Sequence, residues 1–238
     1  MKAAPWLLVV AGDLETGRTV VLDPSEARHL TGALRRRPGD EVILADGSGG
    51  LAEARFVAIG RGRVEAEVLS VRHEPKPESS GVTVALALID NRAMDWAVQK
   101  AVEVGVGRFV PMETERAQIR GRDPVGRVDH WRRIAVQALK QCRRPWAMEV
   151  GNVVPLAELV ERSEEGGVVA DREGCSIGEL PNGVGTLLVV GPEGGFTSDE
   201  SDLFDRHGWP RLRLGPHILR AETAAVVGGA MMVERVSR

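Results

Sequence analysis

The hydrophobic residues follow two different patterns along the chain. Before residue 73, short β-forming segments (RTVVL, DEVILAD, EARFVAI and RVEAEVLSV) alternate with turn sequences such as DGSGG and GRG. This pattern predicts a small β-barrel with one short helix near residues 25–36. After residue 81, apolar strand segments (VTVALALI, RFVPMET, GVVAD, TLLVV, RLRL) alternate with helical ones (MDWAVQKAVEVG, VDHWRRIAVQALKQC, PLAELVERS), and further helices are expected from Ser198 and after Leu219. This alternation predicts an α/β domain whose parallel sheet is covered by helices on both faces.

The stretch between the two patterns has the composition of a linker. Residues 73–81, HEPKPESSG, contain two prolines, charged residues, serines and a glycine, with no apolar side chain. Such a segment has little surface to bury. We therefore expect a barrel domain over residues 1–72, a linker over 73–81, and an α/β domain over 82–238.

Residues 187–199, LLVVGPEGGFTSD, predict a buried strand, a glycine loop and a helix start. The first four residues are continuously apolar, as in strands that a parallel sheet buries on both faces. Glycines permit close approach of the backbone, and Thr197 with Glu200 has the spacing of a helix capping box. In open α/β sheets, ligands bind beyond the carboxyl ends of the strands.

The chemistry of this loop argues against a nucleotide polyphosphate. The loop contains neither G-x-G-x-x-G nor G-K-S/T, and it places Glu193 where a polyphosphate would lie. Repulsion between like charges favours a neutral or cationic ligand instead. Taken alone, the same residues also suit a tight turn with a surface glutamate.

A second loop of this type lies in residues 212–232, LRLGPHILRAETAAVVGGAMM. A strand ends at Gly215 and Pro216, and a helix rich in alanine and glycine follows. Its small residues predict close packing, either within one core or against a second subunit. Arg220 and Glu222 flank the turn, where they either position a substrate amide or imide, or form a surface ion pair.

The composition is that of an ordinary globular protein, with 238 residues, 43% hydrophobic and 27% charged. The net charge of -3 gives no overall argument for a nucleic-acid partner. No apolar stretch reaches the roughly 18 residues of a membrane span, so we expect a cytoplasmic protein without membrane contact. Cys142 and Cys175 lack the spacing of metal ligands, so we expect no metal site.

Positive charge is nevertheless concentrated between residues 116 and 144. Nine basic residues stand there against two acidic ones, and on a helix starting near Val128 several of them share the face opposite the apolar side chains. Such a face binds RNA phosphates, or it is solvated and balanced by acidic neighbours. With a second cluster near residue 36, the expected RNA-binding residues are Arg35, Arg36, Arg37, Arg116, Arg133, Lys140, Arg143 and Arg144.

These motifs together resemble the SPOUT class of methyltransferases, specifically the bacterial 16S ribosomal RNA uridine-N3 methyltransferase family. GPEGGF followed by LGPHILRAETA matches its two cofactor loops, KAVEVGVGRFVPMETERA resembles its K-x-x-E-L-G-V…P-x-x-T-E-R-S stretch, and HLTGALRRRPGDEV resembles its H-L-x-x-V-L-R-x-x-x-G-D-E. The chain departs from the family at residues 5–8, PWLL, where relatives have an Arg-Phe-Phe type opening. It also has Ala221 in place of threonine and Ala117 in place of serine.

The resemblance implies a fold and a function. The fold is a PUA-like β-barrel followed by a SPOUT domain with a C-terminal trefoil knot, working as a homodimer. The function is methylation of N3 of a uridine in 16S ribosomal RNA of the small ribosomal subunit, with S-adenosylmethionine as cofactor. By motif position, the cofactor contacts are expected at Val190, Gly191, Glu193, Gly194, Gly195, Leu214, Gly215, Ile218, Leu219 and Ala224.

Three residues are candidates for catalysis in this scheme. Arg220 would stabilise negative charge on a uracil carbonyl oxygen, and Glu193 or Glu222 would orient the base or take the N3 proton. Two alternatives remain open from the sequence. One is a SPOUT enzyme that acts on a ribose 2'-oxygen or on guanosine N1, and the other is a non-catalytic RNA-binding factor of ribosome assembly.

Overall fold

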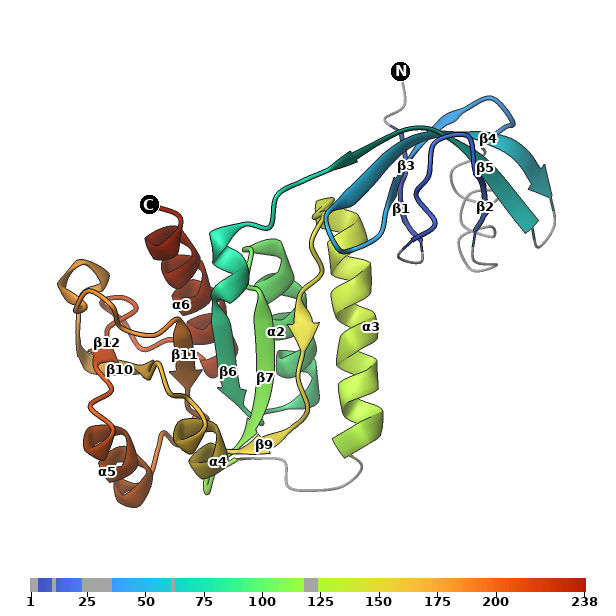
Figure 1. Ribbon diagram of the computed structural model, residues 1–238. Helices are drawn as coiled ribbons and strands as arrows, with labels where there is room; N and C mark the ends of the chain where they lie inside the picture. Colours follow the sequence, from blue (N-terminus) through green and yellow to red (C-terminus); the bar gives the residue numbers. More distant parts are fainter. Residues whose placement is uncertain (1–3, 10–11, 23–35, 61–62, 118–123) are drawn as a thin grey trace. The chain divides into compact units, whose positions relative to one another are not determined.

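The computed structural model describes residues 4–9, 12–22, 36–60, 63–117 and 124–238 (Figure 1). The chain forms two compact units. The first contains Met1–Lys76 together with Leu139–Ala147, and the second contains Pro77–Ala138 together with Met148–Arg238. The short helix expected near residues 25–36 lies, except for its last residue, outside the described residues.

The first unit contains a five-stranded sheet with the order β1-β3-β4-β5-β2. Four strands confirm the predicted β segments, and side chains such as Leu44, Phe56 and Val64 fill its core. The strand β1 was not predicted, because a single short apolar run gives no sign of its partner; it pairs parallel with β3. The strands are β1 (Trp6–Leu8), β2 (Thr19–Val21), β3 (Glu41–Ala45), β4 (Gly50–Gly60) and β5 (Arg63–His73).

The second unit contains a seven-stranded sheet with the order β12-β10-β11-β6-β7-β8, and β9 also pairs with β7. All its strand pairs in the described part of the chain are parallel, as the alternating pattern predicts. The strands are β6 (Thr83–Ala87), β7 (Arg108–Glu113), β8 (Glu149–Val150), β9 (Val154–Pro155), β10 (Gly167–Cys175), β11 (Leu187–Val190) and β12 (Arg211–Leu212).

Helices cover both faces of this sheet, which confirms the prediction (Figure 1). On one face, α4 and α5 enclose an apolar cluster that includes Val189 of β11 and the stacked rings of Phe204 and Trp209. On the other face, α6 packs on β6 and β11 and beside α2. The helices are α2 (Asn91–Glu103), α3 (Pro124–Cys142), α4 (Leu156–Glu161), α5 (Ser198–Arg206) and α6 (Ala221–Val236), with short 3-10 helices η1 (Glu78–Gly81) and η2 (Ile177–Glu179).

Close packing explains the two adjacent glycines of α6. A Cβ atom at Gly228 would overlap the side chain of Leu188, and one at Gly229 would lie 2.9 Å from Val106 and 3.1 Å from Val84. Only glycine therefore lets α6 approach the sheet this closely. The sequence left open a core or a subunit contact for these small residues, and at these two positions the structure shows the core.

Residues 139–147 belong with the first unit, although the sequence predicts that they lie in the α/β domain, residues 139–142 as the end of one helix. The backbone of Trp146 forms a β-bridge with Ser48. Its indole nitrogen donates to the carbonyl oxygens of Glu74 and Pro75, each at 3.1 Å. This segment is thereby tied to the end of β5, inside the stretch expected to be a linker.

Candidate active site

Two loops leave the same edge of the parallel sheet. The strand β11 is buried between β6 and β10, and β12 lies on the other side of β10. Because these strands run parallel, their carboxyl ends meet at one edge. We call residues 191–197, after β11, the first loop, and residues 213–220, after β12, the second loop. This edge is where open α/β sheets bind ligands.

The first loop is a tight turn that runs directly into a capped helix. Gly195 has a positive φ of 67°, and its amide donates to the carbonyl of Pro192 at 2.9 Å. At the end of the loop, Thr197 caps α5, and both hydrogen bonds of the capping box with Glu200 are present. The strand, glycine turn and capping box predicted from this stretch are therefore confirmed.

The segment that follows β7 contacts the first loop. Arg116 Nη1 donates to the carbonyl oxygen of Gly194 at 2.8 Å and to that of Phe196 at 3.2 Å. The backbone amide of Glu115 donates to Glu200 Oε1 at 2.8 Å. Sequence reasoning did not find these contacts, since they join residues about 80 positions apart. The available signal was the TER sequence at the end of the predicted strand RFVPMET, in a stretch that resembles the family motif P-x-x-T-E-R-S.

The second loop is more exposed. Its first amide, that of Arg213, donates to the carbonyl of Cys175 at 2.8 Å, and Leu214 packs beside Gly228 of α6. The side chain of Ile218 is 73% exposed. At the end of the loop, Arg220 is the N-cap residue of α6 and makes no side-chain capping bond.

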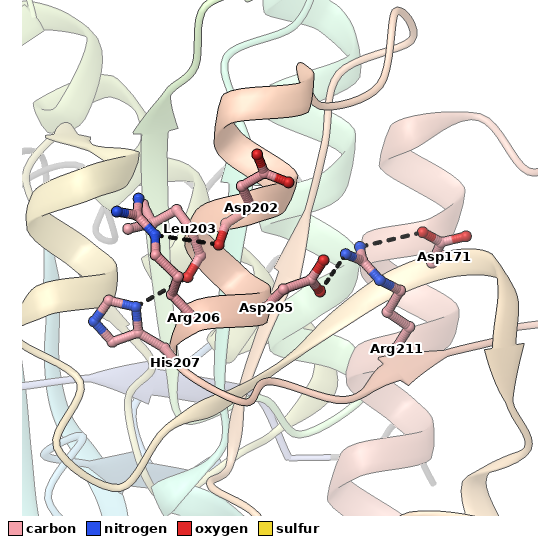
Figure 2. A network of polar contacts seen from close by, with 7 residues as sticks. All are labelled: Asp171, Asp202, Leu203, Asp205, Arg206, His207 and Arg211. Carbon is pink, nitrogen blue, oxygen red and sulfur yellow. Dashed lines mark hydrogen bonds and ion pairs between the residues drawn. The ribbon is translucent and has the colours of Figure 1, made fainter.

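Arg211, in β12 just before the second loop, links three elements (Figure 2). Its guanidinium lies between Asp205 of α5, at 2.6 Å, and Asp171 of β10, at 3.5 Å. Figure 2 also shows that Arg206 and His207 bond to carbonyl oxygens within α5 itself, so they do not take part in this link. Arg211 therefore connects β12 both to the neighbouring strand and to the helix that follows the first loop.

The three candidate catalytic residues lie in the two loops or directly after them. Glu193 is exposed in the first loop, Arg220 is exposed at the N-cap of α6, and Glu222 is partly exposed in the first turn of that helix. Among the described residues, no ion pair joins Arg220 to either carboxylate. The surface pair left open by the sequence is thus not present here, and the three charges face solvent separately.

The expected cofactor residues differ in exposure. Val190 and Ala224 are buried, and they support the loops from the strand and the helix. Glu193, Gly194 and Ile218 are exposed. The remaining five, which are partly exposed, are Gly191, Gly195, Leu214, Gly215 and Leu219.

The expected RNA-binding residues are divided between the two units. Arg36, Arg37, Lys140, Arg143 and Arg144 belong to the first unit, and Arg116 and Arg133 to the second, while Arg35 lies outside the described residues.

The predicted faces of α3 are confirmed for its buried Trp131 and Ala135 and for its exposed Arg133. Beyond the helix, Arg143 is exposed and has a left-handed backbone, with a φ of 58°. Burial lowers the pKa of the Arg144 guanidinium, because desolvation disfavours its charged form. Arg133 and Arg143 therefore present their charge to solvent more fully than Arg144 does.

Neither a membrane span nor a metal cluster is found in the described part of the chain. No helix there combines the length and the apolar character that crossing a membrane requires. No group of three or more His, Cys, Asp or Glu side chains is placed there to hold a metal ion.

Comparison with known proteins assigns the family. Residues 76–233 match the model of an RNA methyltransferase domain, and residues 22–69 match that of an RNA methyltransferase PUA domain. The chain is 34% identical to ribosomal RNA small subunit methyltransferase E of Mycobacterium tuberculosis, with 90% of this chain and 85% of the relative covered. It is 30% identical to the protein of that name from Aquifex aeolicus, covering 88% and 92%.

Solved structures agree with these matches. The ribosomal RNA small subunit methyltransferase E of Neisseria gonorrhoeae, bound to S-adenosylmethionine, has a TM-score of 0.87 at 29% identity and covers 97% of each chain. A methyltransferase of Legionella pneumophila, in complex with the same cofactor, also has a TM-score of 0.87, at 25% identity over 98% of each chain. The chain therefore belongs to the RNA methyltransferase family, with an RNA methyltransferase PUA domain preceding the methyltransferase domain.

Proposed function

We propose that this protein transfers a methyl group from S-adenosylmethionine to N3 of a uridine in the 16S ribosomal RNA of the small ribosomal subunit. The observation that carries the proposal is the meeting of the two glycine-containing loops at one carboxyl edge of the sheet, in a chain of the RNA methyltransferase family. Relatives named for small-subunit ribosomal RNA support the substrate, and structural neighbours bound to S-adenosylmethionine support the cofactor. The choice of N3 rests on the resemblance of the loop motifs.

The residues at this edge fit such a cofactor. A Cβ atom at either Gly195 or Gly215 would meet no atom within 4 Å, so the main chain of both loops is open to a nucleoside. The exposed carboxylate of Glu193 attracts a positive charge and repels a polyphosphate. When bound, S-adenosylmethionine supplies a methyl group on a positively charged sulfur.

The charged side chains around the loops would serve the transfer in separate roles. N3 of uridine carries a proton that must leave before or during methylation, and the negative charge then spreads to the uracil carbonyl oxygens. Arg220, exposed at the N-cap of α6, would stabilise that charge. Glu193 or Glu222 would orient the base or accept the proton. Because N3 lies on the Watson–Crick edge, the uridine must be unpaired or flipped out of its helix.

Several finer features belong to the same proposal. The resemblance supports a trefoil knot in the second unit, closure of the five-stranded sheet into a PUA-like barrel, and a homodimer as the working form. It also supports action in the cytoplasm, where ribosomal subunits are assembled. Sedimentation of the purified protein would test the dimer directly, since a monomer at micromolar concentration contradicts it.

One experiment tests the activity and separates the alternatives. Purified protein is incubated with methyl-labelled S-adenosylmethionine and unmodified small ribosomal subunits, and the modified nucleotide is mapped by mass spectrometry of digested RNA. We expect one label at uridine N3. A label on a ribose oxygen or on guanosine N1 would identify another SPOUT activity. Absence of both labelling and cofactor binding would leave a non-catalytic RNA-binding factor.

A further inference from the structure

One arginine of the expected RNA-binding set makes its contacts inside the candidate active site. Arg116 follows β7, and its Nη1 donates to two carbonyl oxygens of the first loop, those of Gly194 at 2.8 Å and Phe196 at 3.2 Å. Its aliphatic part lies along the loop, since a Cβ atom at Gly194 would be 3.5 Å from Arg116 Cδ and 3.6 Å from its Cβ. The side chain therefore covers the loop as well as bonding to it.

A second contact ties the same segment to the end of the loop. The amide of Glu115 donates to Glu200 Oε1 at 2.8 Å, while Glu200 Oε2 accepts from the amide of Thr197 at 2.9 Å. The carboxylate that closes the capping box thus also binds the segment after β7. Because β6 lies between β7 and β11, these contacts do not follow from strand pairing. Instead, the side chains of Arg116 and Glu200 connect the segment after β7 with the segment after β11, across the intervening strand β6.

These contacts order a segment whose ordering costs much conformational entropy. The first loop contains three glycines in five residues, and glycine loses more conformational entropy on ordering than any other residue. Hydrogen bonds from a charged donor are stronger than those between neutral groups, and they hold the loop before any ligand arrives. Affinity gained in this way comes from a preformed site and not from a contact with the ligand.

We propose that Arg116 is a positioning residue that holds the first loop in its ligand-binding conformation. The proposal rests on the proposed function for the identity of the ligand, S-adenosylmethionine. It reassigns Arg116 from the expected set of RNA contacts, since its Nη1 donates to two carbonyl oxygens of the loop. Glu115 and Glu200 form the second point of the same link.

The test compares Arg116→Ala with Arg133→Ala, an exposed arginine of the second unit from the same RNA-binding set. Cofactor affinity is measured by calorimetry without RNA, and RNA affinity separately with small-subunit RNA. We expect Arg116→Ala to weaken S-adenosylmethionine about tenfold, and Arg133→Ala to leave it unchanged and weaken RNA instead. In turnover, KM for the cofactor should rise while kcat changes less than about twofold. The tenfold figure corresponds to about 1.4 kcal/mol.

Conservative substitution and a ligand-free measurement complete the design. Arg116→Lys keeps a charged donor for the same carbonyls, so its cofactor affinity should lie between those of wild type and Arg116→Ala. Amide hydrogen exchange of residues 191–197 without ligand should be faster in Arg116→Ala and unchanged in Arg133→Ala. Unaltered exchange in Arg116→Ala, or unaltered cofactor affinity with weakened RNA binding, would overturn the proposal. If wild-type protein binds no S-adenosylmethionine, the proposed function fails, and the exchange data still decide whether Arg116 holds the loop.

Discussion

The two loops at the carboxyl edge of the sheet are held in different ways. The first loop is fixed along its length, by its own turn, by Arg116 and by the capping box at Thr197. In the second loop, the backbone hydrogen bonds of the described structure lie at the two ends, and Ile218 in its middle is 73% exposed. In the proposed site, we therefore expect the first loop to be formed in advance and the second loop to adjust when a ligand binds.

The largest effect is expected where the second loop rests on the core. Gly228→Val would force a side chain into Leu188 and towards Leu214, which lies 3.1 Å from the position of a Cβ. Overpacking of a dense core costs about 2–3 kcal/mol, which lowers Tm by roughly 5–10 °C in a chain of this size. Thermal unfolding measures the change. Gly215→Ala is the control, because a Cβ there meets no atom within 4 Å, and an equal fall in Tm for both variants would contradict the packing argument.

The cap at the end of the first loop should contribute about half as much to the stability of the fold as the close packing at Gly228. Thr197→Ala removes the oxygen that accepts from the amide of Glu200, and loss of such a cap costs about 1 kcal/mol. Urea unfolding measures the free energy of unfolding, and Thr197→Ser, which keeps the hydroxyl, should retain most of it. If the alanine variant is as stable as wild type, the first loop does not depend on its cap, and the contrast between the loops weakens.

A smaller effect is expected from the ion pairs of Arg211, in β12 just before the second loop. Arg211→Met removes both ion pairs shown in Figure 2. Because the side chains of Asp171 and Asp205 are 34% and 61% exposed, solvent screens both pairs, and we expect the free energy of unfolding to fall by less than about 1 kcal/mol. The loss should shrink in 1 M salt, where the Debye length falls to about 3 Å. Arg206→Met is the control, since among the described residues Arg206 bonds to the carbonyl of Asp202 within α5 and joins no other element. A loss that does not change with salt would indicate that packing, not charge, holds β12.

Local features of the site could be predicted from the sequence, whereas contacts between distant elements could not. The first loop follows from local rules, because apolar strand residues, glycines and the Thr197–Glu200 spacing are all contained in 14 consecutive residues. The contacts of Arg116 with the first loop and of Arg211 with Asp171 join elements that are distant in sequence, and no periodicity indicates which charged side chain meets which partner. For the same reason, the pairing of β1 with β3 and the place of residues 139–147 in the first unit were not predicted.

The smallest effect on stability, and the sharpest test of the contrast, is expected at Ile218. Because this side chain is largely exposed without ligand, Ile218→Ala should change the free energy of unfolding by less than about 0.5 kcal/mol. If the second loop closes over S-adenosylmethionine, the lost apolar contact weakens cofactor binding by about 1 kcal/mol, or roughly fivefold. Calorimetry measures the cofactor affinity of this variant, and urea unfolding measures its stability, so the two effects are distinguished. Thr197→Ala, in the first loop, is the comparison, and it should change both stability and cofactor affinity. An Ile218→Ala variant that loses stability or keeps full cofactor affinity would show that the second loop does not adjust to the ligand.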